Sequence, residues 1–291
     1  MAFPRSPVEV ACDESGSEGD KLVGGNTDVF AHASVVVGVD EAAEAVRDIR
    51  GRIRSPATEY KANHLLRAKH RAVLTWFLGP DGPLVAAHVY LVDKPFLAVT
   101  SVVDGVDAAA ELYRAGRTGA DPVRWWAFLE AANELGRVRS ADPDPVKTFL
   151  RAVDALGLAA AARESIVEPM NQADVSLDPL PPAIVRTVEH WSDGGRSVRV
   201  VHDQTNALTP DRLAELDRRL GPKRLASLTM VDSVDDPRVQ LADFLAGVAR
   251  KIAENALNGH PDRELTTALR PYVDANSVWA DTESWDALVS E

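Results

Sequence analysis

Acidic side chains end three apolar runs of this sequence. Asp13 and Glu14 follow VEVAC, Asp93 follows VYLV, and Asp203 follows VRVVH. An isolated carboxylate is costly to bury, so each of these acids needs solvent, a cationic partner or a bound cation. Carboxylate oxygens are also the ligands that Mg²⁺ prefers in proteins. The pattern is therefore typical either of ordinary turns at strand ends or of a divalent-metal site.

A further acid, Asp243, lies inside the apolar helical run QLADFLAG. Helical spacing places Gln240, Asp243 and Gly247 on one face. An aspartate among Leu and Phe has poor helix propensity and poor solvation, so we expect it to face a partner. Acids that converge from separate elements repel one another unless a cation is bound. Two such cations would activate water and stabilise an in-line phosphoryl displacement.

Each acid also has a purely structural interpretation. Asp13 would accept backbone hydrogen bonds in the Gly-rich turn that follows it, and Asp203 would form an Asx turn. Asp243 would pair with a core arginine or cap a neighbouring helix. Asp93 stands beside Lys94, which predicts a local ion pair. Spacing alone leaves the metal site and the structural interpretation open.

The elements that position these acids alternate between strands and helices. Apolar β-branched runs predict strands at residues 8–13, 30–39, 85–95, 197–206 and 225–233, and periodic runs predict helices at 41–54, 64–78, 208–221 and 239–257. The first two strands are joined by a Gly-rich turn, which predicts an antiparallel hairpin. We therefore expect an α/β fold. A doubly wound nucleotide fold is disfavoured, because the sequence has no GxGxxG after the first strand and no GxxxxGK[ST].

Residues 104–195 differ from the remainder of the chain. They contain Ala-rich and Leu-rich periodic segments separated by Pro-rich joints. We interpret this stretch as a helical insertion or cap, and residues 1–103 and 196–291 as the α/β core. The adjacent Trp125 and Trp126 make the insertion a candidate surface for a protein partner or for a second copy of the chain in a homodimer.

Composition narrows the classes of partner. The 291 residues are 45% hydrophobic, which is enough for a sizeable core, and the single cysteine excludes a disulfide framework within the chain. With no signal-peptide pattern and no long apolar run, we expect a cytoplasmic protein without membrane contact. The formal net charge of -12 disfavours loose binding to phosphate backbones. Residues 47–71 are the local exception, with eight Lys or Arg against two acids, and form either a solvated basic face or a contact for nucleic acid.

Four motifs stand in a defined order along the chain: CDESGS near the start, TEYKAN at residues 58–63, VHDQ at 201–204, and VDSVDDPRVQLADFLAG at 231–247. Together they resemble the bacterial and archaeal family known as domain of unknown function 3800, which is itself similar to the ribonuclease H-like group. The resemblance implies a ribonuclease H-like mixed sheet that opens with an antiparallel meander and is flanked by helices. Residues 104–195 have no counterpart in it.

The same resemblance implies roles for individual residues. It makes Asp13, Asp203 and Asp243 ligands of Mg²⁺ or Mn²⁺, with Glu59 as a further metal-binding acid. Lys61, in an E-x-K pattern with Glu59, would join these acids in catalysis by positioning a phosphate or the nucleophile; the alternative is an exposed ion pair between the two. The resemblance also implies four residues that orient these carboxylates: Glu14, Ser15, Ser233 and Gln240.

The expected function is a metal-dependent nuclease or phosphodiesterase that hydrolyses RNA or DNA, with Arg52, Arg54 and Lys61 meeting the phosphates. This chemistry is transferred from fold relatives. The alternative is a non-catalytic interaction module on the same scaffold, which recruits a partner through residues 104–195. A serine hydrolase is disfavoured because DESGSEG is not GxSxG.

Overall fold

The computed structural model describes residues 6–54, 61–137, 143–157, 166, 177–192 and 195–290. Within these ranges, five strands form one open sheet: β1 (Val8–Ser15), β2 (Val29–Val35), β3 (Ala87–Asp93), β4 (Val198–Asp203) and β5 (Leu225–Val231). Their order in the sheet is β3-β2-β1-β4-β5. The first three strands form an antiparallel meander, whereas β4 runs parallel to β1 and β5 runs parallel to β4. The expected α/β class with a mixed sheet is confirmed.

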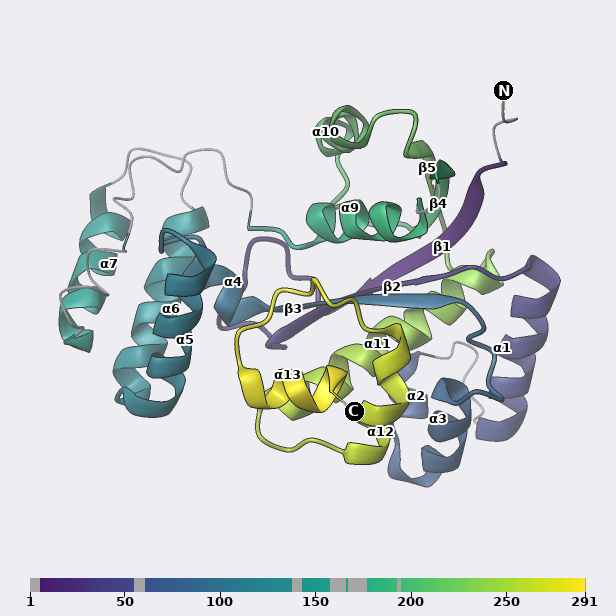
Figure 1. Cartoon of the computed structure of the whole chain (residues 1–291), viewed down its shortest axis with the longest axis horizontal. Helices are drawn as coiled ribbons and strands as arrows, with labels where there is room; N and C mark the ends of the chain where they lie inside the picture. Colours follow the sequence, from purple (N-terminus) through teal and green to yellow (C-terminus); the bar gives the residue numbers. More distant parts are fainter. Residues whose placement is uncertain are drawn as a thin grey trace.

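Helices cover both faces of the sheet (Figure 1). One face carries α9 (Leu180–Trp191) and α10 (Pro210–Leu220), and the other carries α11 (Pro237–Leu257), α12 (Arg263–Leu269) and α13 (Thr282–Val289), with α1 (Val39–Ile53), α2 (Ala62–Leu65) and α3 (Arg71–Leu78) on the same side. Alternate strand residues divide between two cores, with Ala11 in the α11 core and Val10 in the α9 core. No helix in the described ranges has both the length and the apolar character needed to cross a membrane.

Two predicted elements are divided in the structure. The helix expected at 64–78 consists of α2, a 3-10 turn at Ala68–His70, and α3. The chain bends there because α2 packs on α11 while α3 packs on α12. The strand expected at 85–95 ends at Asp93, and α4 (Lys94–Thr100) follows at once. Pro95 lies in the first turn of α4, where its missing N–H costs nothing.

Part of the predicted insertion packs in an apolar cluster that it shares with α4 and with residues 22–23. The helices α5 (Val106–Gly119), α6 (Pro122–Arg137) and α7 (Pro143–Leu156) lie beyond one end of the sheet (Figure 1). Their aromatic centre consists of Tyr113, Trp125, Phe128 and Phe149. In contrast, α9 lies within the same 104–195 range but packs on β2, β3 and β4. Within the predicted insertion, α5 to α7 therefore pack beside α4 and one another, whereas α9 packs on the sheet.

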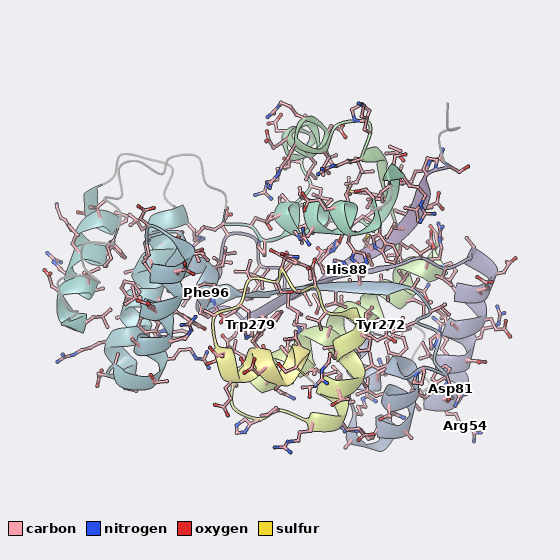
Figure 2. The ribbon with its side chains drawn as sticks, viewed as in Figure 1. Arg54, Asp81, His88, Phe96, Tyr272 and Trp279 are labelled. Atoms are coloured by element: carbon pink, nitrogen blue, oxygen red, sulfur yellow. The ribbon has the colours of Figure 1, made fainter. Side chains whose placement is uncertain are left out.

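The C-terminal segment covers the outer edge of β3. Residues 273–278 run parallel beside this strand. His88, which Figure 2 labels on β3, contacts Asp274 through Nε2 and Oδ2 at 2.9 Å. Arg186 of α9 donates to the same oxygen at 3.0 Å. These contacts fix the chain end to the sheet and protect an edge that would otherwise be open to pairing.

Candidate functional site

Asp13 and Asp203 come from neighbouring positions on β1 and β4. The parallel pairing of these strands places Cys12 opposite His202. Asp13 and Asp203 are the next residues on these strands. Because side chains alternate between the two faces of a sheet, they share the face of Ala11 and Val201, which is the α11 face. Asp13 is only 7% exposed. The fold thus brings together two acids separated by most of the chain.

Asp243 approaches the same place from α11. This helix packs directly on β1 and β2. Burial raises the pKa of Asp13 most, the charges of Glu14, Asp243 and Asp203 contribute in that order, and together they bring it to about 9. Such an influence requires charges at short range in a poorly solvated site. We call Asp13, Asp203 and Asp243 the acid cluster.

The acid cluster has the donor chemistry of a hard divalent cation. All of its oxygens are carboxylate oxygens, and a bound cation would reverse the repulsion that raises the pKa of Asp13. Among the described residues, however, no group of three or more His, Cys, Asp or Glu is arranged as a metal-binding set. Glu59, the fourth expected ligand, lies outside the described residues. The residues present fit the chemistry of Mg²⁺ or Mn²⁺ without forming a closed set of ligands.

Hydrogen bonds hold Asp203 in place. The backbone N–H of Ser233 donates to Asp203 Oδ1 at 2.9 Å. Gln240 of α11 donates through Nε2 to the carbonyl oxygen of Ser233 at 2.8 Å. Ser233 therefore contacts the carboxylate through its backbone, and Gln240 acts on it through Ser233. Ser15 lies apart from this chain of contacts, since its Oγ accepts from Arg250 Nε at 3.1 Å.

Asp93 does not join the acid cluster. It is buried and caps α4, accepting a hydrogen bond from the N–H of Phe96 at 3.1 Å. Burial raises the pKa of its carboxyl to about 7. The predicted ion pair with Lys94 is wrong: Lys94 Nζ instead contacts Glu18 at 2.7 Å and Thr27 at 2.9 Å. The side chains diverge because Asp93 ends the strand while Lys94 begins the helix.

A buried polar network lies on the opposite, α9 face of the same strands. His202 Nδ1 lies 2.9 Å from the carbonyl oxygen of Asp203, His32 Nε2 lies 3.3 Å from His202 Nε2, and Thr187 Oγ1 lies 3.1 Å from His32 Nδ1. Burial lowers the pKa of both histidines, which keeps them neutral. We call His32, Thr187 and His202 the neutral network.

Only one arrangement of protons satisfies the neutral network. A carbonyl oxygen can only accept, so His202 must donate through Nδ1 and accept at Nε2. His32 then donates through Nε2, which leaves its Nδ1 to accept from the hydroxyl of Thr187. The sequence contained a weak indication of this network, since His202 directly precedes Asp203. The roles of His32 and Thr187 required the strand register and the position of α9.

The side chain of Glu14 lies beside the neutral network, on the opposite face of β1 from Asp13. Its Oε2 lies 3.5 Å from His202 Nε2 and has no hydrogen-bond partner among the described residues. Burial and then the charges of Asp203 and Asp178 raise the pKa of Glu14, a hydrogen bond from Thr205 lowers it, and the result is about 7. Adjacent residues on a strand point to opposite faces, so Glu14 and Asp13 have different neighbours, although the Glu14 charge still contributes to the raised pKa of Asp13. Asp178, which the sequence did not single out, thus also influences this site.

The basic segment at residues 47–71 is largely exposed. Arg71 is the exception, because its guanidinium is paired with Asp262 and Glu264. The other seven Lys and Arg side chains, Lys61 among them, are exposed. Arg52 stacks over Trp76, with its Cζ 4.0 Å from the ring centroid, and Arg54 ends α1 (Figure 2). This exposure suits both a solvated face and a contact with phosphates.

The sequence was also compared with known proteins. No family model matches it, and no curated protein matches it. The candidate site is therefore defined by its geometry. That geometry places like charges on one face of the sheet ends and a neutral, hydrogen-bonded network on the other.

Proposed function

We propose that this protein is a Mg²⁺- or Mn²⁺-dependent phosphodiesterase that hydrolyses RNA or DNA. The observation that carries the proposal is the acid cluster, in which burial and neighbouring acids raise the pKa of Asp13 to about 9. Acids held together against their own repulsion are typical of functional sites. A divalent cation is the simplest partner that would stabilise them.

The proposal includes a ribonuclease H-like fold. The strand order β3-β2-β1-β4-β5, with an antiparallel meander followed by two parallel strands, supports it. So does the place of the acids, on two adjacent central strands and on a late helix. The four motifs that resemble the domain of unknown function 3800 family contain all three of these acids.

The chain's own residues have defined tasks in this reaction. A bound divalent cation supplies an activated water and a Lewis acid for the scissile phosphate. Asp13, Asp203 and Asp243 would hold it, with Glu59 as a further ligand. The backbone of Ser233 fixes the orientation of Asp203. The ammonium group of Lys61, the residue immediately before α2, would contact the phosphate.

Nucleic acid is the proposed substrate because of the distribution of charge. The chain carries a formal net charge of -12, yet seven exposed Lys and Arg side chains lie between residues 47 and 71. An acidic surface repels polyanions, so a productive encounter would be directed to this basic segment. Lys61 lies within the segment and next to α2, which packs on α11.

The test is cleavage of labelled single- and double-stranded RNA and DNA by purified protein with Mn²⁺. We expect cleavage by the natural protein and a loss of about 100-fold or more in Asp13→Asn and Asp243→Asn, because each removes a charged ligand. Asp48→Asn, an exposed change on α1, is the matched control and should cleave normally. Equal cleavage by the natural protein and Asp13→Asn, or none by either, would contradict the proposal.

A second candidate function is an interaction module that acts through α5 to α7. The observation that favours it is the exposure of Val123 (77%) and Trp126 (43%), which share one face of α6. This function predicts self-association that Trp126→Ala abolishes and Asp13→Asn leaves unchanged. Light scattering coupled to size exclusion measures it. A monomer in all three proteins would argue against a homodimer formed through this surface.

A further inference from the structure

The start of α2 touches α11 at Gly247, one helical turn beyond Asp243. A Cβ placed on Gly247 would lie 2.3 Å from the Cβ of Ala62 and 3.9 Å from Ser15 Oγ. Carbon atoms in contact normally stay about 3.5 to 4.0 Å apart, so the first of these distances leaves no room for a methyl group. Gly247 and Ala62 are both buried. The end of β1, the start of α2 and the middle of α11 therefore meet at a point that requires glycine.

The backbone itself does not require glycine at this position. Gly247 lies inside the regular helix α11, where alanine is favoured over glycine by about 1 kcal/mol. Gly51 of α1 provides a contrast, since a Cβ there would meet nothing within 4 Å. The close approach of Ala62 therefore leaves no space for a side chain at residue 247.

Each segment at this contact carries a residue of the proposed site. Lys61 immediately precedes Ala62, Ser15 follows Asp13 by two residues, and Gly247 follows Asp243 by four. We infer that Gly247 is a positioning residue that sets the separation between Lys61 and the acid cluster. The functional part of this inference rests on the proposed phosphodiesterase activity, whereas the docking of α2 does not.

The test exchanges the two small side chains. Gly247→Ala should push α2 away from α11, whereas Gly247→Ala combined with Ala62→Gly should restore the contact, because the next atom of Ala62, its Cα, lies 3.8 Å from the added Cβ. Gly51→Ala is the matched control for the helical substitution.

The first measurement is amide hydrogen exchange within α2. The N–H groups of His64 and Leu66 report on this helix, since they donate to the carbonyls of Lys61 and Ala62 at 2.9 and 3.1 Å. We expect exchange about tenfold faster or more in Gly247→Ala, and near-natural exchange in the double variant and in Gly51→Ala. If Gly247→Ala fails to fold, recovery of folding and of α2 protection in the double variant gives the same answer.

The second measurement is Mn²⁺-dependent cleavage, which should fall about tenfold in Gly247→Ala and recover in the double variant. Natural exchange of α2 in Gly247→Ala, or no recovery in the double variant, would overturn the inference. So would displaced α2 with unchanged cleavage. If the natural protein cleaves nothing while α2 responds as expected, the docking at Gly247 stands and the phosphodiesterase proposal fails instead.

Discussion

At the ends of β1 and β4, the polar groups on the two faces of the sheet differ in charge and in hydrogen bonding. On the α11 face, Asp13 and Asp203 lie near Asp243, and the pKa of Asp13 is raised first by burial and then by the charges of Glu14, Asp243 and Asp203. On the α9 face, His32, His202 and Thr187 are neutral and satisfy one another. Residues adjacent in sequence thus belong to different environments, because side chains on a strand alternate between faces.

This difference separates stability from function. A fully satisfied buried network stabilises the fold and specifies one arrangement of its side chains. Like charges around a buried carboxyl such as Asp13 destabilise the fold and persist where function needs them. We therefore expect substitutions on the α9 face to lower stability, and substitution of the acid cluster to raise stability while removing activity.

The largest expected effect on stability comes from His32→Ala. This change opens a cavity beneath α9 and removes the partners of both His202 and Thr187, which should lower the free energy of unfolding by about 3 kcal/mol. Urea denaturation at neutral pH measures it. His260→Ala, at an exposed position, is the control and should have little effect. A loss no larger than that of the control would show that the network does not form in solution.

Asp13→Asn should have a smaller effect of the opposite sign. In the metal-free protein, the pKa of Asp13 rises from 3.8 to about 9 on folding. The folded state therefore holds a proton that the unfolded state lacks between these values, and stability falls as pH rises through this window. At pH 8 the natural carboxyl is ionised in the unfolded state and must take up a proton on folding, whereas an amide does not titrate. The unfolding free energy of Asp13→Asn at pH 8 should therefore exceed that of the natural protein by about 2 kcal/mol.

The pH profile distinguishes this cause from a general effect of the substitution. Near pH 4 the advantage of Asp13→Asn should disappear, since the natural carboxyl is then protonated in the folded state and partly in the unfolded state. Added Mn²⁺ should raise the melting temperature of the natural protein and leave that of Asp13→Asn nearly unchanged. An advantage that is constant between pH 4 and pH 9 would argue against repulsion within the acid cluster.

The smallest expected effect is that of Thr187→Val. This nearly isosteric change removes the donor to His32 Nδ1 and should cost about 1 kcal/mol, because the ring nitrogen is left without its partner. Thermal unfolding measures it, with the exposed Thr118→Val as control. Cleavage activity should remain unchanged in Thr187→Val. A change in activity as large as that of Asp13→Asn would mean that the two faces do not act separately.

Local sequence patterns predicted most of the elements. The strand predicted at 225–233 is present at 225–231, and the helix predicted at 239–257 is present at 237–257. Thr209 caps α10, as its position before Pro210 indicates, and accepts from Arg212. The division of residues 64–78 was missed because periodicity does not record that α2 and α3 pack on different helices. The ion pair of Asp93 was predicted wrongly, since adjacency in sequence does not reveal a change from strand to helix.

The candidate site was predictable only in part. Asp13, Asp203 and Asp243 were identified as acids in unusually apolar surroundings, which is a local property of the sequence. His32, Thr187 and Asp178 were missed, because each acquires its role from contacts with residues far away in the chain. Gln240 was expected to orient a carboxylate, and the structure shows it bonded to the carbonyl of Ser233, which holds Asp203.

The sequence by itself determined which residues carry charge, where most strands and helices lie, and that Asp243 shares a helix face with Gly247. Only the tertiary structure decided which of these residues meet. Strand pairing placed Asp13 beside Asp203 and turned Glu14 toward His202, and the docking of α2 gave Gly247 its role. Local propensity acts over a few residues, whereas convergence of a site depends on register and packing between segments far apart along the chain.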